Sequence, residues 1–216
     1  MTRTEIVHVG GFDLASVSSG VTYVRGEWDG TQVHIEALHE RAYKIENHFV
    51  SHYECAKLML RDTLVFKEKY GLDLCAVEDY TMQTVSQVSF SIGEIGGLVR
   101  GFHFDAGIPI LLNKPMVMRS FAANGRKLPK GASGKRALIS LAKEDFGHAS
   151  SCHYSKERSD CCDAWWHSVL GVYTLLFVKG VPLDIISPKR QEIWRNKKGT
   201  GIFDTLEYRL LSPKGK

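Results

Sequence analysis

The order of apolar and polar positions along the chain predicts strands at its beginning, then alternating helices and strands. The first strand is expected over residues 7–14, and a turn near residues 18–20 leads into a second strand over residues 21–25. The pair Asp29-Gly30 predicts a hairpin turn, because Asp-Gly accepts the positive φ angles of tight two-residue turns. A third strand over residues 32–37 follows, so we expect a three-stranded antiparallel meander.

Longer patterns fill the rest of the chain. Apolar residues at spacings of three and four predict an amphipathic helix over residues 46–70, ended by Gly71. The run 72–77 is continuously apolar, as expected of a strand covered on both faces. Further helices are expected over residues 84–104, 135–146 and 160–178, and short strands over residues 109–113 and 117–121. Together these elements predict an α/β fold, in which a mixed sheet of three antiparallel strands and then parallel strands has helices on both faces.

Composition is that of an ordinary globular domain. The chain has 216 residues, of which 44% are hydrophobic and 24% charged, enough for one sizeable core. Its beginning lacks the pattern of a secretory signal, and the apolar stretch 164–178 is interrupted by His167 and too short to span a bilayer. Five cysteines, two of them adjacent, argue against a secreted disulfide framework. We therefore expect a soluble protein with no membrane partner, in the cytoplasm of a bacterium or of a phage-infected host.

Basic residues gather in two parts of the chain, although the net charge is only +4. Residues 106–142 contain no Asp or Glu. The basic residues of this block that we expect to bind nucleic acid are Lys114, Arg119, Arg126, Lys127, Lys130, Lys135 and Arg136. A second surplus lies at the end, so we divide the chain into residues 1–179 and a basic C-terminal extension, 180–216. Such blocks favour a polyanion, because each neutralised phosphate releases counterions, but a solvated surface explains either block alone equally well.

Four carboxylates occupy positions that call for an explanation. Asp13 lies within the first predicted strand among apolar and small residues, and Glu78 follows directly after the apolar run that ends at Val77. Asp160 and Asp163 are three residues apart at a predicted helix start and so share one face. Brought together, four carboxylates would repel one another without a divalent cation, and Mg²⁺ accepts such oxygen ligands.

Each of these carboxylates, taken alone, also has a simpler explanation. Asp160 could cap its helix and favour the helix dipole. Glu78 could form a surface ion pair, and Asp79 beside it is an equally acidic choice on chemistry alone. Only their order is specific: a strand Asp, a strand-end Glu, then Asp-x-x-Asp at a helix start.

This order and the local sequences resemble the RuvC family of Holliday junction resolvases, within the ribonuclease H-like superfamily. The resemblance spans residues 7–178 and rests on four stretches. They are FDLAS at 12–16 with SGV at 19–21, VEDY at 77–80, GEIGGLVRG at 93–101, and SDCCDA at 159–164. The resemblance implies a ribonuclease H-like fold. Cys161 and Cys162 depart from it, since small residues are more usual between the two Asp.

The resemblance also implies an activity. A homodimer would nick two opposed strands of a four-way DNA junction symmetrically and leave 5′-phosphate and 3′-hydroxyl ends. Two Mg²⁺ ions are implied, with Mn²⁺ as a substitute, and the implied ligands are Asp13, Glu78, Asp160 and Asp163. The stretch GKRALI at 134–139 resembles the family segment whose Lys assists cleavage, which makes Lys135 the fifth catalytic candidate. Arg126 or Lys127 resembles a second basic family position, in a loop of different length.

Other functions on the same fold stay open. A nuclease for flaps, forks or other branched DNA would have the same active site and differ only in its DNA-binding surface. A non-catalytic nucleic-acid-binding module would not explain four carboxylates kept together. A sugar-kinase-like ATPase would need glycine-rich phosphate loops, and none follows Gly10-Gly11.

Several further residues could carry chemistry, but we expect structural roles for them. The possible zinc ligands, among which no Cys-x-x-Cys pair occurs, are His148, Cys152, His153, Cys161, Cys162 and His167. His167 lies one turn after Asp163 on the same face and could touch the site, although a buried structural role is expected. Trp165 and Trp166 are expected in the core. Glycines that share one helix face, and so predict close approach of a neighbouring backbone, are Gly93, Gly97 and Gly101.

Overall fold

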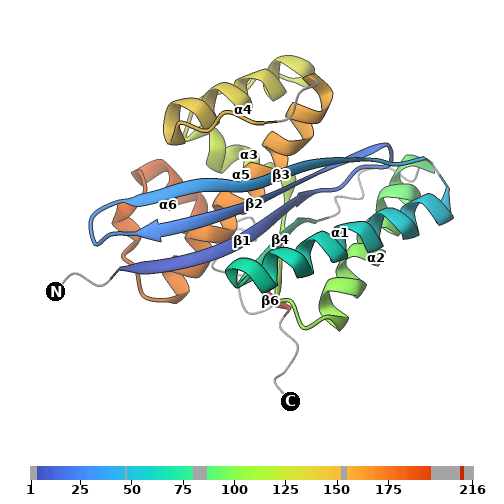
Figure 1. The fold of residues 1–216 in the computed structure, drawn as a ribbon. Helices are drawn as coiled ribbons and strands as arrows, with labels where there is room; N and C mark the ends of the chain where they lie inside the picture. The colour runs from blue at the N-terminus through green and yellow to red at the C-terminus, as the bar shows by residue number, and fades with distance from the viewer. Residues whose placement is uncertain (1–3, 47, 80–86, 152–154, 196–209, 212–216) are drawn as a thin grey trace.

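The computed structural model describes residues 4–46, 48–79, 87–151, 155–195 and 210–211. Within these ranges one mixed sheet has the strand order β3-β2-β1-β4-β5-β6 (Figure 1). The strands are β1 (Glu5–Asp13), β2 (Ser18–Trp28), β3 (Val33–Lys44), β4 (Leu74–Glu78), β5 (Ile110–Asn113) and β6 (Leu210–Leu211). The first three are antiparallel, β4 and β5 continue parallel to β1, and β6 is antiparallel to β5. The predicted mixed α/β sheet is therefore confirmed.

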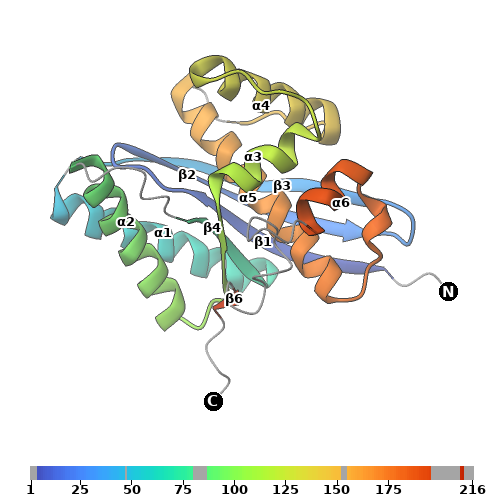
Figure 2. The ribbon, with the colours of Figure 1, turned by 180° about the vertical axis from the view of Figure 1, so that it is seen from behind.

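Helices cover both faces of this sheet (Figures 1 and 2). They are α1 (Phe49–Tyr70), α2 (Gln87–Asp105), α3 (Pro115–Ala123), α4 (Gly131–Phe146), α5 (Ser155–Val178) and α6 (Pro188–Arg195), with a 3₁₀ turn at Leu183–Ile185. α1 and α2 pack on the face that contains Phe12 and Val77. α5 crosses the opposite face over Val9 and Ala76, with α3 and α4 in the same core. Because successive strand residues point to opposite faces, residues next to Phe12 and Val77 in sequence point toward α5.

Residues 117–121, predicted as a strand, belong to α3, so this prediction is wrong. Pro115 stands at the start of the helix, where its missing N–H costs nothing. Val117, Met118 and Phe121 are buried, and their spacing of three and four places them on one helical face. A five-residue apolar run does not distinguish a strand from a short helix by periodicity, and the proline was the overlooked signal.

The turn expected near residues 18–20 is also misplaced. Ser18, Ser19 and Gly20 lie in β2, whose pairing with β1 begins with Gly20 opposite Asp13. The chain instead reverses over residues 14–17. Ser19 Oγ accepts a hydrogen bond from the Ala15 N–H at 3.1 Å. A residue of β2 thus stabilises the turn that precedes the strand.

Part of the expected C-terminal extension packs on the same core as α5. Trp194 of α6 is 1% exposed, and its ring meets Phe121 edge to face. Arg190 forms an ion pair with Asp145 and donates to the Phe121 carbonyl oxygen at 3.0 Å. Residues 181–194 are thus joined to the main body of the fold, and a boundary at residue 180 stays a prediction.

α5 is the central helix of the core. The stretch Glu157–Val178 is long and apolar enough to cross a membrane by length and composition, but 83% of its most apolar window is buried inside the protein. Trp165 and Trp166 are fully buried, as predicted. Core helices of soluble proteins pass the same composition test, and this packing is that of a core helix.

The glycine face of α2 has no backbone against it in the described part of the chain. A Cβ added at Gly93, Gly97 or Gly101 would meet no atom within 4 Å. The close backbone approach that these glycines predicted is therefore not found within the described packing.

Candidate active site

Two carboxylates stand at the ends of neighbouring parallel strands. Asp13 is the last residue of β1 and Glu78 the last of β4, and the register that pairs Phe12 with Val77 sets them side by side. Since Phe12 and Val77 face α1 and α2, Asp13 and Glu78 face α5. The strand thus directs Glu78, and not the next residue Asp79, toward the helix.

α5 brings further polar side chains over these strand ends. Asp160, Asp163 and His167 are 5%, 4% and 0% exposed, and their spacing of three and four places them on one face of the helix. The helix is fixed to β2 by a buried hydrogen bond from Thr22 Oγ1 to the Cys161 carbonyl oxygen at 3.0 Å. The carboxylates of β1 and β4 and those of α5 therefore face each other between the sheet and the helix.

Two glycines allow the helix to lie this close to the sheet. A Cβ at Gly20 would lie 2.7 Å from the Cys161 backbone nitrogen and closer still to the Asp160 carbonyl group. A Cβ at Gly11 would lie 2.6 Å from the Ser168 backbone nitrogen, again with backbone oxygen nearer. A side chain at Gly20 would displace the part of α5 that contains Asp160, and one at Gly11 the part that contains Ala164 and Ser168.

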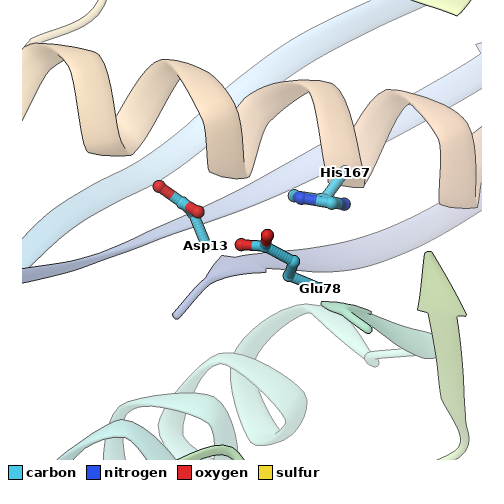
Figure 3. Close-up of side chains that lie close together, drawn as sticks. All are labelled: Asp13, Glu78 and His167. Atoms are coloured by element: carbon cyan, nitrogen blue, oxygen red, sulfur yellow. The ribbon is translucent and has the colours of Figure 1, made fainter. Parts of the chain in front are cut away.

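Asp13, Glu78 and His167 form one compact group between α5 and the strand ends (Figure 3). One ligand-type atom from each residue lies within 4.8 Å of the others. Lys135 reaches the same place from α4, with its Nζ 3.4 Å from Asp163 Oδ2 and 3.5 Å from Asp160 Oδ1. We call these six residues the carboxylate centre: Asp13, Glu78, Lys135, Asp160, Asp163 and His167.

Burial and mutual repulsion disfavour the ionised carboxylates of this centre. Burial, followed by the charges of Glu78 and Asp163, raises the pKa of Asp13 well above its ordinary value. Burial also raises the pKa of Glu78 and of Asp163, against the opposing charges of Arg119 and Lys135. The protein alone therefore does not supply enough positive charge to keep these carboxyl groups ionised at their usual pH.

Lys135 stays charged in the centre, whereas His167 is neutral. Burial alone would lower the pKa of Lys135, but the charges of Asp163 and Asp13 outweigh it, and the pKa is raised. Burial lowers the pKa of His167 to about 3, with a smaller contribution from Arg119. A neutral imidazole keeps one ring nitrogen with a free lone pair, which is the form that binds metals.

The donor atoms of this centre fit a divalent cation. Asp160 Oδ2, Asp163 Oδ1 and both ring nitrogens of His167 are buried without a hydrogen-bond partner in the ranges that the structure describes. Buried polar atoms normally have hydrogen-bond partners. A bound cation would satisfy these unpartnered oxygen and nitrogen atoms, which lie beside carboxyl groups whose pKa is raised. The residues present therefore fit the metal that the sequence resemblance implies.

No protein-family model matches the sequence, and no curated protein matches it at a significant level. The structure is similar to that of T. thermophilus RuvC in complex with a Holliday junction substrate, with a TM-score of 0.58 and 16% identity over 81% of this chain and 98% of that chain. The chain has the fold of RuvC. A second Thermus thermophilus RuvC structure has a TM-score of 0.56 and 18% identity over 77% of this chain and 98% of that chain. The RuvC resemblance and the ribonuclease H-like fold class expected from the sequence are thereby confirmed.

On this RuvC fold the predicted residues of the centre lie together, with three local corrections. α5 begins at Ser155, so Asp160 lies inside the helix and is not its cap. Lys135 lies in the second turn of α4 rather than at its head. His167 was expected to be structural, yet it belongs to the centre. The signal for it was its position four residues after Asp163, which places both on one helix face.

The other possible zinc ligands that lie in the described ranges do not gather on the RuvC fold. His148 stacks on Trp165, with ring centroids 3.9 Å apart, and its Nε2 lies 3.1 Å from Glu40 Oε1. Cys152 and His153 lie outside the described residues. Among described residues, the one group of three or more His, Cys, Asp or Glu side chains able to hold a metal is that of Asp13, Glu78 and His167.

Of the predicted nucleic-acid-binding residues, Lys135 lies in the carboxylate centre, and three others line a groove next to α3, α4 and α6 of the RuvC fold. Arg119, Arg126 and Lys130 line this groove, which we call the basic groove. The charge of Arg119 also opposes the rise that burial causes in the pKa of Glu78 and Asp163, so the groove adjoins the centre. The predicted residues that do not line the groove are Lys114, Lys127, Lys135 and Arg136.

Proposed function

We propose that this chain is a metal-dependent endodeoxyribonuclease that resolves four-way DNA junctions by symmetric phosphodiester cleavage. The observation that carries the proposal is the convergence of partly buried carboxylates from β1 and β4 with the buried carboxylates of α5, beside Lys135. Carboxylates that repel one another without a cation are the ligand set of metal-dependent phosphodiester hydrolysis. The similar RuvC structure holds a Holliday junction substrate, which favours branched DNA as the substrate of this chain.

The four carboxylates of the centre would hold two Mg²⁺ ions, for which Mn²⁺ substitutes. When bound, such ions activate a water on one side of the phosphate and stabilise the departing 3′ oxygen on the other. Asp13 and Glu78 are fixed at strand ends, and Asp160 and Asp163 on a helix tied to β2, so these oxygens are oriented before substrate arrives. The products are a 5′-phosphate and a 3′-hydroxyl.

Lys135 supplies positive charge at the reacting phosphate. Its side chain is 39% exposed, and its ammonium group, shared between Asp160 and Asp163, is placed to approach a phosphate oxygen on the solvent side of the centre. Stabilising charge there contributes about 3 kcal/mol to catalysis when water is excluded. Arg119, Arg126 and Lys130 of the basic groove would hold the DNA backbone alongside.

A homodimer completes the proposal. Symmetric resolution requires two identical centres that act on two opposed strands, and a two-fold pair of chains supplies them for a two-fold branched substrate. Sedimentation velocity of the full chain tests this directly, with one species of twice the chain mass as the expected result. A strictly monomeric chain that still makes paired symmetric nicks would contradict the dimer.

The function is tested by cleavage of a labelled synthetic four-way junction beside linear duplex and flap DNA, with Mg²⁺ or with EDTA. The variants are Asp163→Asn, which removes a carboxylate of the centre, and Asp105→Asn, a matched change at an exposed helix end. We expect paired symmetric nicks on the junction from the native chain and Asp105→Asn, and none with EDTA or from Asp163→Asn. Equal cutting of flaps would favour the general branched-DNA nuclease, and no metal-dependent cutting would refute the proposal.

A further inference from the structure

A fully buried histidine faces the carboxylates with both ring nitrogens unsatisfied. His167 is 0% exposed, and neither Nδ1 nor Nε2 has a hydrogen-bond partner in the part of the chain that the structure describes. One of its ligand-type atoms lies within 4.8 Å of oxygens of Asp13 and Glu78. In Figure 3 its ring occupies the space between α5 and the two strand-end side chains.

A second fully buried histidine provides a comparison with a structural imidazole. His103, on the other face of the sheet, is also 0% exposed. Its Nδ1 lies 2.7 Å from the Val99 carbonyl oxygen, and its Nε2 lies 2.9 Å from Thr63 Oγ1. Both nitrogens are therefore satisfied, as the cost of burying polar groups requires. His167 lacks this satisfaction although it is equally buried, so a structural role leaves its nitrogens unexplained.

A residue that is not one of the carboxylates holds the backbone of His167 in place. Asn113, the last residue of β5, donates from its Nδ2 to the His167 carbonyl oxygen at 3.4 Å. Asn113 itself pairs in register with Glu78 on the neighbouring strand β4. The turn of α5 that contains His167 is thus tied to the end of β5 that lies beside the strand-end carboxylate Glu78.

We propose that His167 is a direct nitrogen ligand of the metal ion held by Asp13 and Glu78, and that it makes this position favour Mn²⁺ over Mg²⁺. The inference rests on the metal-binding part of the proposed function. Mg²⁺ demands oxygen ligands and gains little from imidazole, whereas transition metals accept mixed carboxylate and imidazole sets. Asp13, Glu78 and Asp163 offer only oxygen atoms, which both metals accept. His167 is therefore the residue that discriminates between Mn²⁺ and Mg²⁺.

The test measures metal binding by the full chain without DNA, after metal is stripped with a chelator. Mn²⁺ binding is followed by the electron paramagnetic resonance of the free ion, and Mg²⁺ binding by calorimetry. His167→Asn should weaken Mn²⁺ binding at least roughly tenfold, the lower end of the loss seen when only a ligand-orienting group is removed. It should change Mg²⁺ binding much less, because the asparagine oxygen suits Mg²⁺. His167→Phe, which fills the space with no donor, is the second variant if the first does not fold.

The matched control is His103→Asn, in which an equally buried histidine is replaced on the opposite face of the sheet. It should lower stability and leave the ratio of Mn²⁺ to Mg²⁺ affinity unchanged. If the native chain binds both ions and folded His167 variants keep that ratio, the inference is wrong and the proposed function stands. If the native chain binds neither ion, or if Asp13→Asn leaves binding of both intact, the metal-dependent function itself fails.

Discussion

Substitution of Gly20 by alanine tests whether the distance between α5 and β2 sets the carboxylate centre. The added Cβ would lie 2.7 Å from the Cys161 nitrogen and closer to the Asp160 carbonyl group. These are backbone atoms of a helix, so they cannot rotate away. Carbon atoms pack at about 3.5–4.0 Å, and α5 must therefore retreat from β2 by on the order of 1 Å.

The retreat has a structural and a functional consequence. It stretches the hydrogen bond from Thr22 to Cys161, and overpacking of this kind costs about 1–3 kcal/mol, or about 2–4 °C of melting temperature per kcal/mol for a chain of this size. It also moves Asp160 and Asp163 away from Asp13 and Glu78. A misplacement of about 1 Å typically costs on the order of a hundredfold in rate, and we expect that loss in single-turnover junction cleavage.

Gly97→Ala is the matched control, because a Cβ there meets nothing within 4 Å. This variant should gain up to about 1 kcal/mol from helix propensity and keep metal affinity unchanged. Thermal unfolding by circular dichroism measures stability, single-turnover junction cleavage measures the rate, and calorimetric titration measures metal affinity in both variants. A Gly20→Ala chain with native melting temperature and native metal affinity would refute the reasoning, since α5 would then not touch β2 at this point.

Three further results are expected. In the metal-free protein, the stability gain of Asp13→Asn over the native chain should grow as pH rises above the ordinary pKa of an aspartate, because burial, then Glu78 and Asp163, raise the folded pKa of Asp13. The native chain has its full stability below the unfolded pKa and loses it as pH rises through the folded pKa, so a gain that calorimetry finds flat with pH would contradict this. Lys135→Met should slow single-turnover cleavage by about 10²–10³ and Lys143→Met on the same helix should not, so equal rates for the two would exclude a role for Lys135 at the phosphate. The double change of Lys197 and Lys198 to Gln should reduce the salt dependence of junction binding by up to about two in log–log slope, and an unaltered slope would show that this part of the C-terminal extension does not contact DNA.

The sequence by itself determined the places of the carboxylates within their elements. The sequence placed Asp13 within the first strand, Glu78 directly after an apolar run, and Asp160 and Asp163 on one helical face, because strand and helix periodicities are local properties of the backbone. The four stretches that resemble RuvC added the fold, and the structure confirms it. The places within elements needed only residue spacing, whereas the fold came from the family resemblance.

The tertiary structure decided what depends on distances between elements. Residues 117–121 became a helix because Pro115 and packing against the core outweighed an ambiguous apolar pattern. Only the packing of α5 against β2 shows that His167 belongs to the carboxylate centre. The same packing shows that Gly20 allows the helix to lie close to the strand. Periodicity tells which face a side chain occupies, but the space between two faces is set by the volumes of residues far apart in the chain, so no local pattern shows it.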